Sequence, residues 1–149
     1  METHADNESC SLPRYELYAH DADVGIRGFG ADPAQAFEAA ALALTAAICT
    51  PEAVLPNHSV ALHCEGANLD DLLFEWINAL VYEMATRRML FSRFRVTVVG
   101  THLGAEAWGE PLDIHRHQPA AEVKGATYTD LKFIELHPGM WMAQCIIDV

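Results

Sequence analysis

Hydrophobic positions recur with a helical period in two stretches of the chain. Over residues 69–84 apolar side chains are spaced three and four apart, and Asn68 stands where a helix N-cap is expected. Earlier in the chain, Asp32 is a suitable N-cap and Pro33 fits the first helical position. The pattern therefore predicts a core helix beginning at residue 69 and a second helix that runs from residue 33 and ends before Pro51.

The other apolar stretches alternate with a period of two or are rich in β-branched residues, which predicts strands. The order of strands, helix, strand, helix and further strands is typical of an α+β fold, with two helices packed on a largely antiparallel sheet. We expect one domain over residues 14–149, preceded by a short flexible tail at residues 1–13. The predicted strands are residues 15–20, 24–30, 59–66, 91–100, 104–110, 121–136 and 141–149.

The charge of the chain limits the classes of partner. The chain has nine Lys and Arg and 21 Asp and Glu, so its formal net charge is -12. Nucleic-acid binding depends on cations that neutralise phosphates, and we therefore expect no direct contact with nucleic acid. A metal cation or a basic protein is a more suitable partner for an acidic domain.

The sequence contains no signal that would direct it out of the cytoplasm. Its N-terminal residues are acidic and polar and lack the basic and apolar regions of a signal peptide, and no apolar run is suited to span a membrane. The four cysteines have no metal-ligand spacing, which is typical of reduced thiols. We therefore expect a cytoplasmic protein without a membrane partner.

Carboxylates gather at the ends of two predicted strands. Asp21 and Asp23 are two positions apart, so an extended backbone would point both to one side and His20 to the other. Asp148 directly follows an apolar strand, and we expect Val149 to carry the terminal carboxylate. Such oxygens brought together would suit Ca²⁺ or Mg²⁺, although solvated strand ends are the alternative that the spacing leaves open.

Lys124 and two histidines are the other candidates for chemistry. Lys124 is one of only two lysines and lies in a strand-like run, where it either faces solvent or places a cation beside the acidic residues. His115 and His117 have an HxH spacing but lie in the polar segment 111–119, which we interpret as a solvated loop. No phosphate-binding glycine loop or nucleophile motif is present.

Four stretches of the chain, in order, resemble the archease family, and the likeness runs from about Tyr15 to Val149. They are YELYAHDADVGIRGFG, NLDDLLFEWINALVYEM, GEPLDIHRHQPAAEVKGATY and WMAQCIIDV. The resemblance implies the archease fold, a two-helix α+β domain described as an SHS2 module inserted into itself. It also implies an accessory factor of the RtcB-type tRNA-splicing RNA ligase that promotes guanylylation of the ligase and multiple turnover, broadens its nucleotide use, and is not itself an enzyme.

The resemblance also assigns roles to residues. It implies a divalent-cation site made by Asp23, Asp148 and Val149, with calcium as the expected ion and magnesium or manganese as alternatives. It links Lys124 and His20 to the activation of the ligase. Asp21 stands where the family usually has Thr, and it adds a carboxylate beside the site that is either a further ligand or a charge behind the ligands.

Two further positions depart from the family pattern, and two other functions stay open. Gly125 replaces the usual Ala after Lys124, and Thr129 stands where the family usually has His. The same carboxylates would also suit a stand-alone metal-dependent phosphohydrolase. A chaperone-like binding module without metal chemistry would leave Asp23 and Asp148 as solvated strand ends.

Overall fold

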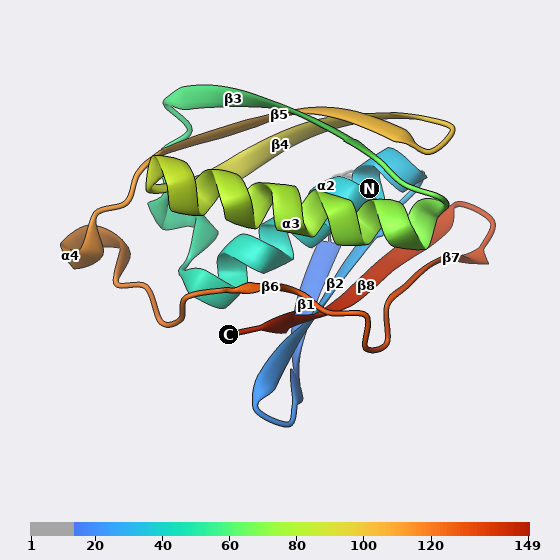
Figure 1. Ribbon diagram of the computed structural model, residues 1–149, viewed down its shortest axis with the longest axis horizontal. Coiled ribbons are helices and arrows are strands. Elements are labelled where there is room, and N and C mark those ends of the chain that lie inside the picture. Colours follow the sequence, from blue (N-terminus) through green and yellow to red (C-terminus); the bar gives the residue numbers. More distant parts are fainter. Residues whose placement is uncertain (1–13) are drawn as a thin grey trace, which may run out of the picture.

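The computed structural model describes residues 14–149, and the predicted tail at residues 1–13 lies outside the described residues. Two antiparallel sheets and two long helices make up this part of the chain (Figure 1). The predicted α+β class is thereby confirmed. The strands divide between two sheets, a division that alternation alone does not reveal because it depends on which strands pair.

The first sheet is built around β8 (Met140–Asp148), the last strand of the chain. One edge of β8 pairs with β2 (Asp23–Gly30), which pairs in turn with β1 (Arg14–His20). The other edge pairs with β6 (Gly125–Ala126) and then with β7 (Lys132–His137). The run predicted as one strand over residues 121–136 is thus two short strands separated by a turn.

The second sheet has three strands in the order β3-β5-β4. These are β3 (His58–Glu65), β5 (His102–Pro111) and β4 (Met89–Val99), and every pairing is antiparallel. Between the helix α2 (Pro33–Ile48) and β3 the chain forms a short 3₁₀ turn, η1 (Pro51–Ala53). After β5 it forms one helical turn, α4 (Ile114–His117).

Both long helices begin where the sequence predicts. In α2 (Pro33–Ile48) the Asp32 Oδ1 atom accepts from the Gln35 N–H at 2.9 Å. In α3 (Leu69–Arg87) the Asn68 Oδ1 atom accepts from the Asp71 N–H at 2.8 Å. These caps satisfy backbone donors that the first helical turn leaves without partners. None of the helices within residues 14–149 has the length and apolarity that a membrane crossing requires.

The core lies where both helices meet the sheets. Trp76 of α3 is fully buried, and its Nε1–H donates to the Phe37 carbonyl of α2 at 3.0 Å. The small residues of α2 let the first sheet approach it closely: a Cβ added at Gly28 of β2 would lie 2.2 Å from the Ala40 nitrogen. The sheet that carries the predicted site is therefore fixed against a rigid helix.

Candidate functional site

Four strands bring the candidate residues into one row across the end of the first sheet. His20 of β1 pairs with Asp23 of β2, and Asp148 of β8 pairs with Gly125 of β6. The β2–β8 register pairs Val24 with Ile147, so one position further it places Asp23 opposite Asp148. Residues opposite one another in a ladder point to the same face of a sheet. The side chains of His20, Asp23 and Asp148 therefore share one face.

This arrangement corrects one prediction. An extended backbone was expected to point Asp21 and Asp23 to one side and His20 to the other. Instead the chain turns over between the paired residues His20 and Asp23, and Asp21 lies in that turn with φ of 54°. His20 therefore shares a face with Asp23. Asp tolerates the left-handed region far better than a β-branched residue, which gives the departure from Thr at this position a backbone reason.

The two carboxylates of the row lie at facing positions of neighbouring strands. Like charges directly opposite one another in a ladder are destabilising. Asp23 is half-buried and Asp148 is exposed, and the hydrogen bonds found within residues 14–149 include none to either carboxylate. Carboxylate oxygens left in this position have the chemistry that hard divalent cations prefer.

The predicted ligands of the cation include only two side-chain carboxylates. A cation site here would therefore need further ligand atoms from outside His, Cys, Asp and Glu side chains. Over residues 14–149 there is no group of three or more such side chains arranged to hold a metal ion. The predicted set has two, Asp23 and Asp148. Its third member, Val149, follows Asp148 directly and is half-buried. A cation held at these two carboxylates would therefore keep water or an external group among its ligands.

Lys124 lies next to the row, although not in a regular strand as predicted. Its backbone N–H donates to the Asp148 carbonyl at 2.7 Å, and its side chain is exposed just before β6. This hydrogen bond fixes the position of the Lys124 backbone relative to Asp148. The structure therefore brings four of the predicted residues, His20, Asp23, Lys124 and Asp148, to one end of the sheet.

Asp130 is a neighbour of the row that sequence reasoning missed. Its Oδ2 atom lies 3.7 Å from His20 Nε2, and its carbonyl accepts from Gln144 Nε2 at 2.9 Å. Asp130 has φ of 52° in the turn between β6 and β7 and directly follows Thr129, which is exposed. No local signal marks Asp130, because its contacts join residues far apart in the chain.

A polar layer on the same face connects the row to the middle of the sheet. Arg27 of β2 donates from Nε to Gln144 Oε1 at 2.7 Å, and its guanidinium lies 3.9 Å from the ring centre of Tyr18. The Tyr18 ring lies across Gly25, where an added Cβ would be only 2.1 Å from the ring. Burial raises the pKa of Tyr18, so its hydroxyl keeps its proton at neutral pH.

A second polar cluster lies at α4, and it corrects the prediction that segment 111–119 is a solvated loop. His117 is only 4% exposed, and its Nε2 lies 2.8 Å from Glu110 Oε2. The Asp113 N–H donates to His117 Nδ1 at 2.9 Å, so Nδ1 is the acceptor and Nε2 carries the proton. Arg116 pairs with the other Glu110 oxygen at 2.7 Å. This histidine is therefore a buried structural residue, whereas His115 is exposed.

The ionisation of Glu110 follows from these contacts. Burial alone would raise its pKa, but hydrogen bonds from Arg116, the Leu55 N–H and His117 outweigh that effect and lower the pKa to about 2. Glu110 is therefore charged at neutral pH. Since Arg116 also donates to the Ala53 carbonyl at 2.8 Å, the cluster connects α4 to η1 and fixes the start of the segment that leads to Lys124.

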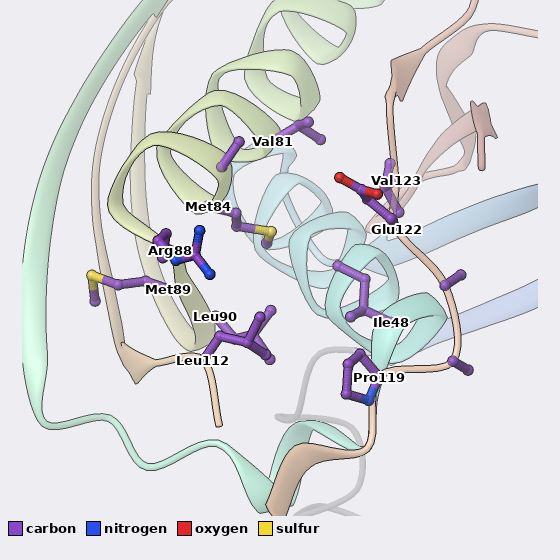
Figure 2. A pocket seen from close by; sticks show the side chains of 13 residues that line it. Ile48, Val81, Met84, Arg88, Met89, Leu90, Leu112, Pro119, Glu122 and Val123 are labelled. Atoms are coloured by element: carbon purple, nitrogen blue, oxygen red, sulfur yellow. The ribbon is translucent and has the colours of Figure 1, made fainter. Parts of the chain in front are cut away.

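An apolar cavity of about 530 Å³ lies between the end of α3 and the segment that precedes Lys124. Figure 2 shows Val81 and Met84 of α3 on one side and Pro119 and Val123 on the other. Glu122 and Arg88 are its two charged lining residues (Figure 2). None of the residues of the row lines it.

Two antiparallel sheets, two long helices and an acidic row at the end of one sheet define an α+β protein with a candidate divalent-cation site. Comparison with known proteins gives the family: the chain belongs to the archeases. The family model described as "Archease protein family (MTH1598/TM1083)" matches residues 15–149.

Individual relatives agree with this assignment over almost the whole chain. The "Protein archease" of Pyrococcus abyssi is 37% identical over 142 residues, which is 93% of this chain and 100% of that protein. That of Methanopyrus kandleri is 33% identical, over 91% of this chain and 99% of the relative. The solution structure of Methanobacterium thermoautotrophicum protein 1598 has a TM-score of 0.79 and 27% identity, and the match covers 91% of this chain and 98% of that one.

Proposed function

We propose that this protein is an accessory factor that activates an RtcB-type tRNA-splicing RNA ligase, and that it acts through a divalent cation. It would promote guanylylation of the ligase and multiple turnover, and it would broaden the nucleotide use of the ligase. Membership in the archease family supports an accessory role. The observation that carries the metal-dependent part is the juxtaposition of Asp23 and Asp148 across neighbouring strands, beside Lys124.

Asp23, Asp148 and Val149 would hold the cation, with calcium as the expected ion and magnesium or manganese as alternatives. A divalent cation supplies charge neutralisation when the triphosphate of a nucleotide is attacked. Asp23 and Asp148 are held by the ladders of β2 and β8, so they do not have to be ordered on binding.

His20 and Lys124 would act on either side of the carboxylates. Asp130 lies within ion-pair distance of His20 and orients its ring beside Asp23. Lys124 is exposed, and its backbone is hydrogen-bonded to Asp148, so its ammonium on a flexible stem would be suited to contact a phosphate or an acidic group of the ligase. The net charge of -12 would speed encounter with a ligase whose RNA-binding surface is basic.

The experiment is a guanylylation assay with the cognate ligase, in which transfer of GMP is followed over several turnovers. We expect stimulation by the native chain and its loss in Asp23→Asn, Asp148→Asn and Lys124→Ala. Glu65→Gln is the matched control, because Glu65 is an exposed carboxylate on the other sheet.

Each alternative predicts a different result in the same experiment. Normal stimulation by both Asp variants would show that the metal site is not needed and would favour a binding module. Hydrolysis of nucleotides or phosphoesters by the isolated protein, lost in the Asp variants, would favour a phosphohydrolase. No stimulation by the native chain would contradict the proposal as a whole.

A further inference from the structure

The segment that carries Lys124 has little regular structure of its own. Between α4 and β7 only Gly125 and Ala126 form a strand. The N–H groups of Lys124 and Thr127 donate to the Asp148 and Ile146 carbonyls of β8, at 2.7 and 2.9 Å. The position of Lys124 therefore depends on a few individual contacts.

One of these contacts comes from helix α3. The Asn78 Oδ1 atom accepts a hydrogen bond from the Ala126 N–H at 2.9 Å. One turn earlier on the same helix, the Phe74 ring stacks on Tyr128, with ring centres 4.1 Å apart and planes 10° apart. Helix α3 thus contacts the segment at two points that follow Lys124, whereas β8 contacts it from the other side.

Gly125 allows Asn78 to reach the segment. A Cβ added at Gly125 would lie 2.9 Å from Asn78 Oδ1, closer than real Cβ atoms come to a neighbour. No backbone atom outside its own neighbourhood stands in the way, so the flexible Asn78 side chain would move aside. Alanine at this position would therefore require the Asn78 amide, whose Oδ1 is the acceptor of the Ala126 N–H, to shift while the fold persists.

We infer that Asn78 is a positioning residue that, together with Gly125, holds Lys124 beside Asp148 for activation of the ligase. The inference rests on the function proposed above for Lys124. Asn78 itself does not belong to the row of carboxylates, and it acts through the backbone at Ala126.

Two measurements test this role, and the first needs no ligase. Asn78→Leu keeps a similar volume but removes the acceptor, so we expect amide hydrogen exchange at Ala126 to rise about tenfold or more. Asn78→Asp keeps an Oδ acceptor and should retain the protection. Gly125→Ala should raise the exchange as Asn78→Leu does. Asn57→Leu is the matched control, because Asn57 is exposed in the loop between η1 and β3.

The second measurement is stimulation of the ligase as a function of the concentration of this protein. We expect Asn78→Leu and Gly125→Ala to lower the maximal stimulation about tenfold, while the affinity for calcium stays as in the native chain. Asn78→Asp should restore the stimulation. A merely structural role for Asn78 would instead lower the melting temperature and the calcium affinity together.

The possible failures can be told apart. If Lys124→Ala abolishes stimulation but Asn78→Leu stimulates normally, this inference is wrong and the proposed function stands. If Ala126 exchange is unchanged in Asn78→Leu, the inference is also wrong. If Lys124→Ala stimulates normally, the role proposed for Lys124 is wrong, and the inference is overturned with it.

Discussion

Lys124 donates its backbone N–H to the carbonyl of Asp148 at 2.7 Å, so a lysine in an irregular segment is held against the end of the last strand. The same strand end lies opposite Asp23, which pairs with His20. Backbone pairing thus brings Lys124 and the two aspartates to one end of the first sheet. Calcium binding at this end of the sheet, and the stability of the elements that support it, can be measured on the isolated protein.

Calcium should stabilise the native protein through the facing carboxylates. At a calcium concentration 100 times Kd, we expect the free energy of unfolding to rise by about 2.7 kcal/mol. Asp23→Asn should lose this increase. Without calcium it should be as stable as the native chain or more stable by about 0.2–1 kcal/mol, because a like-charge pair has been removed. Thermal unfolding with calcium and with a chelator measures both, and an equal calcium response in the two proteins would contradict the assignment.

Asp21 should matter for the turn more than for the cation. Its φ of 54° lies in the left-handed region, so Asp21→Thr should destabilise the protein by about 1 kcal/mol or more. Asp21→Asn should keep the stability and change calcium affinity by less than about threefold, as expected of an exposed charge outside the ligand set. Calorimetric titration with calcium checks the second statement. A loss of affinity as large as that of Asp23→Asn would make Asp21 a ligand.

Close contact between β2 and α2 should make Gly28 intolerant of a side chain. A Cβ there would lie 2.2 Å from the Ala40 nitrogen, which is helix backbone and cannot move aside alone. We expect Gly28→Ala to lower the free energy of unfolding by about 3 kcal/mol. Gly104→Ala is the control, since its nearest atoms would be 3.7 Å away, and it should change stability by less than about 0.5 kcal/mol. Urea unfolding of both variants measures the difference, and similar losses would contradict the close approach.

Glu110 should make the fold sensitive to acid. Its pKa is lowered from 4.5 to about 2 in the folded protein, because hydrogen bonds from Arg116, Leu55 and His117 outweigh the effect of burial. The unfolded chain therefore takes up a proton first, and the stabilising contribution is complete above pH 4.5 and is lost as the pH falls to about 2. Glu110→Gln should unfold more easily at pH 7. The difference in unfolding midpoint between the two proteins should shrink between these pH values, and a constant difference would contradict the assignment.

Local signals in the sequence were sufficient for the helices but not for the sheets. The caps at Asp32 and Asn68 and the helical spacing of apolar residues depend on near neighbours, and both helices begin where predicted. The division of the strands into two sheets depends on pairings between distant segments. The break in the strand predicted at residues 121–136 likewise follows from contacts with α3 and β8.

For the candidate site too, the sequence indicates the chemistry of single residues but not the contacts between distant segments. The chemistry of Asp23, Asp148 and Lys124 could be recognised individually, and the family resemblance grouped them. The pairing of His20 with Asp23 depends on the turn at Asp21, which no local signal in the sequence distinguishes from extended backbone. Burial of His117 was missed because its partner, Glu110, belongs to the preceding strand, and the spacing HxH gives no sign of that contact.

The central claim is that the protein activates its ligase through a cation held at Asp23 and Asp148. The most direct test is multiple-turnover ligation by the cognate ligase, measured over a calcium titration with the native chain, Asp148→Asn and the control Glu65→Gln. We predict that Asp148→Asn needs at least about tenfold more calcium for half-maximal stimulation, as expected when a charged ligand is lost, while Glu65→Gln follows the native curve. Superimposable curves for Asp148→Asn and the native chain would contradict the claim.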